Sequence, residues 1–358
     1  LSPLYSGVIE GVGPRYCPSI EDKVVKFPDR VSHHVFLEPE GLDTDWIYPN
    51  GISTSLAEEV QWELVRTIPG LENADIVAPG YAIEYDFVPP TQLLSTLETK
   101  KVKGLFHAGQ INGTSGYEEA AGQGLIAGIN AALNFLDRAP FTLSRMESYI
   151  GVMIDDLVTK GTQEPYRMFT SRAENRLLLR QDNADTRLMG KGHELGLVSN
   201  EIYNFCLLKK ETVEKEIKRL NTTKVVPNEQ GKELVSKLGV KSLKTPTTLA
   251  GLLKRPEITY SQIIETFNGA SVSKLVGEQV EIQVKYEGFI QRQKQVVSKQ
   301  KKLESYRIPI DFNYEGIPGL SCEVVQKLEN IRPTTLGQAS RISGITPAAV
   351  SIIMLMLK

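Results

Sequence analysis

The sequence predicts an α/β part over about residues 1–140, followed by a mainly helical part that continues to residue 358. Residues 1–140 are rich in Gly and Pro and contain short β-branched runs, as at 34–37 and 75–78. A predicted strand at 104–108 precedes a Gly-rich loop and a helical pattern, which is the order found in α/β nucleotide-binding folds. From about residue 143 onward, apolar residues recur at helical spacing.

Length and composition limit the classes of protein that need to be considered. A chain of 358 residues is too long for one compact core, so two or three domains are expected. Apolar residues make up 41% and charged residues 23%, and no uncharged apolar run reaches the ~18 residues of a membrane helix. The net charge of -2 means that any nucleic-acid surface must be local.

The cysteines and histidines predict neither a metal site nor a disulfide framework. The three cysteines lie far apart, at Cys17, Cys206 and Cys322, which indicates a reducing compartment. No carboxylate or cysteine stands at metal-ligand spacing from a histidine, so we predict no metal site. No signal or transit peptide opens the chain, and its start at Leu1 without a methionine suggests a fragment.

The most informative local motif is the loop after the predicted strand, Gly109-Gln-Ile-Asn-Gly-Thr-Ser-Gly-Tyr-Glu118. Gly113 and Gly116 mark points where the backbone takes positive φ or approaches another group. Ser115 and Glu118 have capping-box spacing, which places a helix start near Gly116. The N-terminus of that helix would suit a phosphate or the pyrimidine edge of a reduced flavin. Ordinary helix–sheet packing remains an alternative, because no Gly-x-Gly-x-x-Gly fingerprint follows a strand here.

Capping signals and periodicity predict the helices of the second part. A capping box at 144–147 precedes a helical pattern at 149–158, and longer patterns cover 201–220, 229–238 and 279–304. Polar stretches at 220–227 and 244–248 predict loops between these helices. We place the domain boundaries at 1–140, 141–285 and 286–358.

Two groups of basic residues are candidates for nucleic-acid contact. The first is a row spaced by four, which would share one helical face: Arg172, Arg176 and Arg180. A solvated face paired with Glu174, Asp182 and Asp185 is the alternative interpretation. The second group lies between Glu287 and Glu304, where no acidic residue occurs; it comprises Arg292, Lys294, Lys299, Lys301 and Lys302. Such a run is usually a solvated helix face, but it also suits a phosphate backbone.

Motifs along nearly the whole chain resemble the MnmG (GidA) family. They are residues 104–128, which include the loop and resemble the family's second flavin-contacting motif, and residues 11–23, 36–41, 47–52, 164–172, 283–288 and 338–344. The resemblance implies a glutathione-reductase-like α/β flavoprotein fragment, with 1–140 as part of the FAD/NAD-binding domain and 286–358 as a tRNA- or partner-binding module. The family's N-terminal flavin loop and a further cysteine would lie upstream of Leu1. We therefore expect this chain alone to hold FAD weakly and to be inactive.

The same resemblance implies an activity. With the GTPase MnmE, an FAD-dependent enzyme of this family adds an aminomethyl or carboxymethylaminomethyl group to C5 of the wobble uridine of tRNA. Methylene-tetrahydrofolate would supply the carbon and NADH the reducing equivalents, in a cytoplasmic homodimer without a membrane segment. Two alternatives are a non-catalytic tRNA- and protein-binding fragment and an unrelated FAD or NAD oxidoreductase, although the basic helical part argues against the oxidoreductase.

The resemblance also assigns candidate site residues. Flavin contacts would fall on the loop, at Gly109, Gln110, Asn112, Gly113 and Gly116. NAD binding would fall on residues 13–27, including Gly13, Pro14, Arg15, Tyr16 and Ser19. Binding of tRNA would involve Arg172, Arg176, Arg180, Arg292, Lys294 and Lys299.

Cys17 is the candidate catalytic residue. Prolines on both sides stiffen its loop, and the nearby Arg15 and Lys23 would favour a thiolate, which could add to uridine C6 or transfer a proton. The alternative is a small buried hydrophobic residue.

Overall fold

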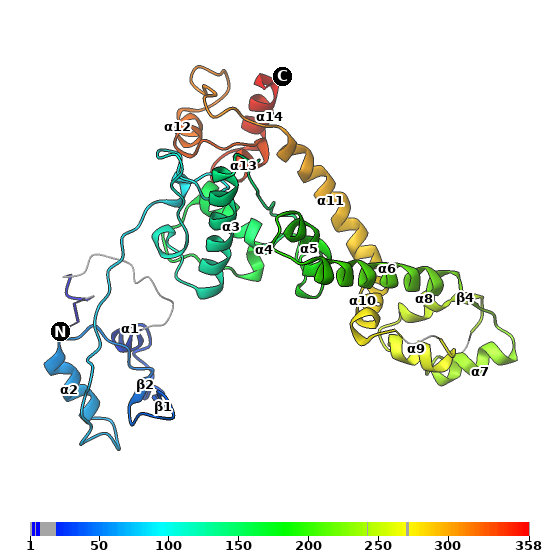
Figure 1. The fold of residues 1–358 in the computed structure, drawn as a ribbon, viewed down its shortest axis with the longest axis horizontal. Coiled ribbons are helices and arrows are strands. Elements are labelled where there is room, and N and C mark those ends of the chain that lie inside the picture. The colour runs from blue at the N-terminus through cyan, green and yellow to red at the C-terminus, as the bar shows by residue number, and fades with distance from the viewer. Residues whose placement is uncertain (1, 4, 8–18, 242, 270–271, 358) are drawn as a thin grey trace. The chain divides into compact units, whose positions relative to one another are not determined.

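The computed structural model describes residues 2–3, 5–7, 19–241, 243–269 and 272–357 (Figure 1). Two compact units emerge from the contacts along the chain. Unit 1 is Leu1–Thr142 with Asp156–Met168, and unit 2 is Leu143–Asp155 with Phe169–Lys358. Helix α4 (Tyr149–Lys160) therefore contributes its first half to unit 2 and its second half to unit 1.

Besides its part of α4, unit 1 contains three helices, two 3₁₀ turns and one hairpin among its described residues. Strands β1 (Phe36–Pro39) and β2 (Ile47–Asn50) pair antiparallel, with Phe36 opposite Asn50. The other elements are α1 (Ile20–Lys26), α2 (Glu58–Arg66), η1 (Pro90–Gln92), η2 (Gly109–Asn112) and α3 (Tyr117–Phe135). The β-branched run at 34–37 overlaps β1, as predicted, whereas residues 75–78 form no strand.

The predicted strand at 104–108 is shorter than its apolar run suggests. Only Phe106 pairs, in a single antiparallel bridge with Glu98. A strand needs a neighbour along its length to satisfy its backbone groups, and Glu98 is the one bridge partner found for 104–108 in the described part of the chain. The predicted order nevertheless holds, because the bridge leads into the η2 turn and then into α3.

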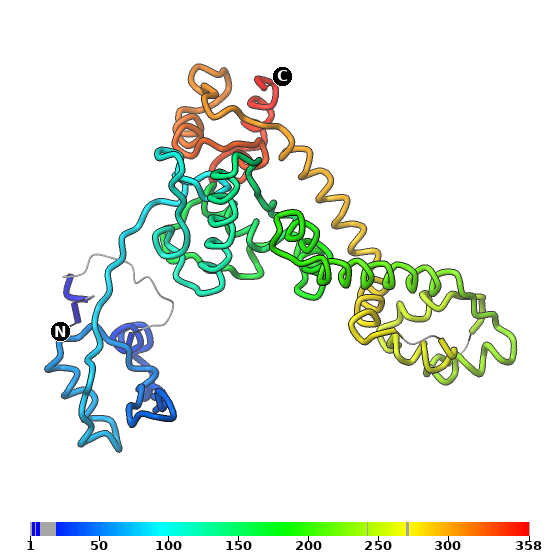
Figure 2. Tube along the Cα trace, viewed as in Figure 1, coloured from blue at the N-terminus to red at the C-terminus, as the bar shows by residue number. Residues whose placement is uncertain are grey.

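Unit 2 is mainly helical, as the sequence predicts. The patterns at 201–220 and 229–238 correspond to α6 (Asn200–Thr222) and α7 (Glu229–Lys237). The pattern at 279–304 is divided between α10 (Lys274–Lys285) and α11 (Glu287–Ser305). The break falls at Tyr286, which caps both helices with a ψ of 8°. Figure 2 shows α6 and α11 as long helices in the chain trace.

The remaining elements of unit 2 are short. They are η3 (Thr170–Arg172), η4 (Gln181–Asn183), α5 (Ala184–Glu194), β3 (Lys224–Val225), β4 (Thr247–Thr248), α8 (Leu249–Leu253), α9 (Tyr260–Thr266), α12 (Cys322–Ile331), α13 (Leu336–Arg341) and α14 (Pro347–Met356).

The described residues of unit 2 form two separate hydrophobic cores. The first joins α6 through α10 and includes the fully buried Leu253 and Ile263. The second joins α12, α13 and α14 and includes the fully buried Leu328, Leu336 and Ile353. Within the described ranges, no helix has both the length and the apolarity needed to cross a bilayer.

Candidate functional site

The loop predicted to contact flavin is a tight turn held by a buried side chain of α3. Gly109 and Gly113 take φ values of 78° and 70°, a region that favours glycine. The Gly109 N–H and the Asn112 Nδ2 both donate to the Gln123 Oε1, each over 2.9 Å. Because Gln123 and Asn112 are fully buried, these bonds fix the loop against the first turns of the helix.

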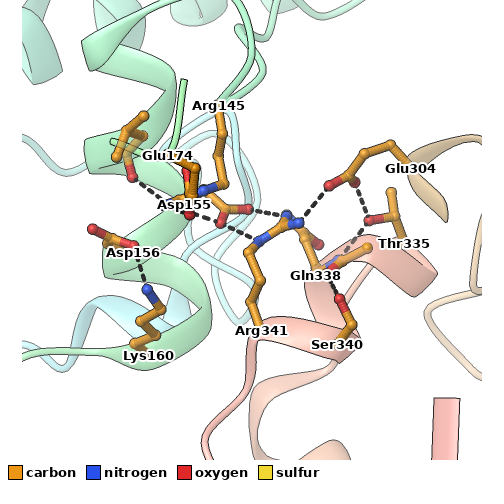
Figure 3. Close-up of polar contacts among 12 residues, drawn as sticks. Arg145, Asp155, Asp156, Lys160, Glu174, Glu304, Thr335, Gln338, Ser340 and Arg341 are labelled. Carbon is orange, nitrogen blue, oxygen red and sulfur yellow. Dashed lines mark hydrogen bonds and ion pairs between the residues drawn. The ribbon is translucent and has the colours of Figure 1, made fainter. Parts of the chain in front are cut away.

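A second segment of unit 1 holds the same loop from the other end. The Tyr166 N–H donates to the Gly113 carbonyl over 2.8 Å, and the Met168 N–H donates to the Glu119 Oε1 over 3.0 Å. The buried Tyr166 hydroxyl donates to the Asp156 Oδ2 over 3.0 Å. Asp156 also pairs with Lys160 over 2.8 Å (Figure 3). The 164–172 motif therefore has a structural role, because Tyr166 and Met168 hold the loop in place, in addition to carrying basic side chains.

The helix after the loop begins where the sequence predicts, but the capping box is wrong. Gly116 is the N-cap of α3, and no side chain caps it. Glu119, rather than Glu118, lies over the first turn, and a Cβ atom on Gly116 would collide with its carboxylate. Ser115 and Glu118 have the spacing of a box, but the helix starts one residue later than that box requires.

Two buried polar side chains of the loop bear on what it could bind. The Asn112 Oδ1 and the Thr114 Oγ1 have no hydrogen-bond partner in the described structure, and both residues are fully buried. Buried polar atoms normally have partners, so these two acceptors fit a ligand that brings hydrogen-bond donors, such as the N–H groups of a flavin ring. The predicted contact Gln110 lies half-buried on the same turn.

Four of the five predicted NAD contacts lie outside the described residues, as does the candidate catalytic Cys17; these contacts are Gly13, Pro14, Arg15 and Tyr16. Ser19 is described, and its Oγ accepts the Asp22 N–H over 3.2 Å as the N-cap of α1. Beside it is a pocket of about 360 Å³ whose lining includes Val24, Leu56 and the buried Glu21. Burial opposes ionisation of Glu21, but its hydrogen bonds with backbone and hydroxyl groups lower its pKa overall.

The arginine row is not a helical face, contrary to the prediction. Between η3 and η4 the chain forms turns, so spacing by four does not align the three side chains. Arg180 pairs with Asp182 over 3.0 Å, as the solvated-face alternative proposed for these residues. Arg172 and Arg176 are exposed.

The fold brings the two basic groups together within unit 2. The Gln293 Nε2 donates to the Glu174 carbonyl over 3.3 Å, and the Asn175 Nδ2 donates to the Gln300 Oε1 over 3.4 Å. These bonds place the 172–176 segment beside α11, which has no buried residue. We call five of the exposed cations of these two elements the basic surface: Arg172, Arg176, Arg292, Lys294 and Lys299.

Sequence reasoning did not identify the residues that hold these two sites in place. Gln123 and Glu119 support the loop, and Gln293 joins the two halves of the basic surface. The one local signal was that Glu119 directly follows Glu118, the residue predicted to cap the helix. No group of histidine, cysteine and carboxylate ligands suited to a metal ion occurs in the described ranges.

Family models match three successive segments of the chain. Residues 1–139 match glucose inhibited division protein A. Residues 200–294 match the tRNA modifying enzyme MnmG/GidA C-terminal helical domain, and residues 296–358 match the C-terminal helical bundle of the same enzyme.

Curated and solved proteins extend this similarity. The chain is 58% identical to the tRNA uridine 5-carboxymethylaminomethyl modification enzymes MnmG of Geobacter metallireducens and Geobacter sulfurreducens, over all of its own length and 57% of theirs. A structure of Aquifex aeolicus GidA is 53% identical with a TM-score of 0.81, covering 96% of this chain and 55% of that one. The three matched segments and these relatives agree, and the chain belongs to the MnmG/GidA family.

Proposed function

We propose that this protein acts in FAD-dependent modification of tRNA, adding an aminomethyl or carboxymethylaminomethyl group to C5 of the wobble uridine together with the GTPase MnmE. The observation that supports it most directly is the loop at 109–116, where two fully buried acceptors lack partners beside a helix N-terminus. The basic surface supplies a place for the tRNA backbone on the same chain.

The residues of the chain have separate parts in this proposal. Gln110 and Asn112 would hold the flavin, and Gln123, which accepts a hydrogen bond from Asn112, orients the loop that presents them. FAD would supply the redox chemistry, with NADH as reductant and methylene-tetrahydrofolate as carbon donor. Cys17, which lies outside the described residues, would add to uridine C6 or move a proton. A cytoplasmic homodimer is part of the same proposal.

The role of Cys17 is tested in full-length protein, because the chain spans 57% of the length of its curated relatives. Cys17→Ser should fold, keep FAD and bind tRNA, yet lose wobble-uridine modification by on the order of 10²-fold. Mass spectrometry of tRNA nucleosides from cells that contain only the variant measures the loss. Normal levels of the modified wobble uridine in the variant would show that Cys17 has a structural role instead.

Binding of tRNA is tested on the basic surface. Replacing both Arg172 and Arg176 by Ala should weaken binding and reduce the slope of log affinity against log salt by roughly one for each phosphate that the variant no longer binds. The control replaces Lys237 and Lys274 by Ala, which removes the same charge from exposed residues elsewhere in unit 2. Equal effects of the two double variants would contradict a specific surface.

An absorbance scan of the full-length protein separates the remaining alternatives. A flavin spectrum together with the specific tRNA effect supports the proposed enzyme. A tRNA effect without bound flavin would favour the non-catalytic binding protein, and bound flavin without any tRNA binding would contradict the assignment of the basic surface to tRNA.

A further inference from the structure

A cluster of buried and partly buried charges lies in unit 2, among side chains to which the proposed function gives no part. Its centre is Asp155 on α4, which is 8% exposed. The Arg341 Nε and Nη2 donate to the two carboxylate oxygens of Asp155, each over 2.6 Å, and the Arg145 Nη1 lies 3.3 Å from the same carboxylate (Figure 3). Paired contacts of this kind fix the orientation as well as the distance of a guanidinium.

One arm of the cluster reaches the 172–176 segment. The Arg145 Nη2 donates to the Arg172 carbonyl over 3.1 Å and to the Glu174 Oε1 over 2.7 Å. Only 5% of the Arg145 side chain is exposed, so the guanidinium is held in one position. The backbone that presents Arg172 is therefore tied to Asp155 through one buried residue.

The other arm reaches the end of α11. The Arg341 Nη1 donates to the Glu304 Oε1 over 2.6 Å, and the Thr335 Oγ1 donates to the Glu304 Oε2 over 2.6 Å. The Glu304 carboxylate also lies so close to Gly337 that a Cβ atom there would collide with it. The C-terminal end of the basic helix is thus held against α13, the helix that carries Arg341.

We propose that Arg145, Asp155, Arg341 and Glu304 are positioning residues that set the two halves of the basic surface at one spacing, so that a single RNA backbone engages both. This inference rests on the tRNA binding proposed above and adds the means by which the surface is organised. Because salt dependence reports how many phosphates are contacted together, a loosened cluster lowers affinity and slope without removing any surface cation.

The test uses full-length protein and purified tRNA. Arg341→Lys keeps the positive charge but cannot make the two parallel hydrogen bonds of the guanidinium to Asp155. Glu304→Gln removes the negative charge that pairs with Arg341 and so weakens only the contact toward α11. Each should weaken tRNA binding on the order of tenfold and lower the salt slope by roughly one or two units. Hydrogen exchange of residues 170–176 should increase in Arg341→Lys. The reason is that Arg341 no longer fixes the Asp155 carboxylate, to which Arg145 also binds.

Arg219→Lys is the matched control. Arg219 pairs with the buried Glu216 in the other core of unit 2, so the same chemical change breaks a comparable fork away from the basic surface. It should leave tRNA affinity and salt slope unchanged. A folded Arg341→Lys or Glu304→Gln protein with wild-type affinity and slope would overturn the positioning role. If the wild-type protein binds tRNA independently of Arg172 and Arg176, the proposed surface itself fails, and this inference fails with it.

Discussion

At Gly116, a side chain of α3 occupies the space that any larger residue would need. The Glu119 carboxylate lies against Gly116 and accepts the Met168 N–H, so a single group closes the loop and holds the 166–168 segment. An acidic side chain in the first helical turn is also favourable for the helix dipole. Glu119 therefore positions both the loop and the 166–168 segment, which is more than helix capping alone requires.

The first prediction concerns this carboxylate. Glu119→Ala in the full-length protein should weaken FAD binding by roughly tenfold, because a charge-assisted hydrogen bond contributes about 1.5–3 kcal/mol. Glu119→Gln keeps an acceptor for the Met168 N–H and should lose less. Titration of flavin fluorescence measures both, and equal affinities in the wild type and the Ala variant would exclude the role.

Lys100 gives a second prediction at the residue scale. Burial lowers its pKa from 10.5 to about 8, while its Nζ donates to the Thr91 carbonyl over 2.7 Å. Between these pH values the unfolded chain binds a proton that the folded chain does not, so stability should rise as pH increases from 8 toward 10.5, by at most about 3 kcal/mol. Lys100→Met should remove that rise.

Urea unfolding of full-length protein at about pH 8 and about pH 10 measures this difference. Lys101→Met, at the exposed neighbouring position, is the control and should leave the pH dependence as in the wild type. An unchanged pH dependence in Lys100→Met would show that other groups cause it.

At the scale of single elements, helix starts follow local chemistry closely. Thr259 and Gln262 form a reciprocal capping box at α9, with the Thr259 N–H donating to the Gln262 Oε1 over 2.8 Å. The positions where helices are interrupted depend less on the local sequence. The apolar pattern runs through Tyr286 although the helix breaks there, and the arginines spaced by four lie on turns.

The third prediction tests the cap of α9. Thr259→Ala should lower the free energy of unfolding by about 1 kcal/mol, because the Gln262 N–H loses its acceptor. Thr259→Ser keeps the hydroxyl and should cost much less. Chemical unfolding compares the two, and equal losses would point to packing of the Thr methyl group instead.

At the scale of the whole molecule, the two cores of unit 2 share no residue. Leu253→Ala in the first core and Leu328→Ala in the second should each cost about 2–5 kcal/mol, since both side chains are fully buried. Because the sites are independent, the double variant should equal the sum within about 0.5 kcal/mol. Unfolding monitored by circular dichroism checks this, and strong non-additivity would show that the cores are coupled.

The sequence by itself determined the helical second part, the helix start after the loop, and the family. These features depend on neighbours in the chain or on motifs of consecutive residues, which the sequence displays directly. Periodicity was sufficient for α6 and α7 because each buries one continuous face in a core.

Only the tertiary structure decided which distant groups meet. Arg341 and Asp155 are 186 residues apart, yet they form the centre of a buried cluster, and the 172–176 segment meets α11 across more than a hundred residues. No local spacing encodes such contacts. They arise when helices with separate apolar faces pack together and the buried charges between them must find partners, since an unpaired buried charge costs several kcal/mol.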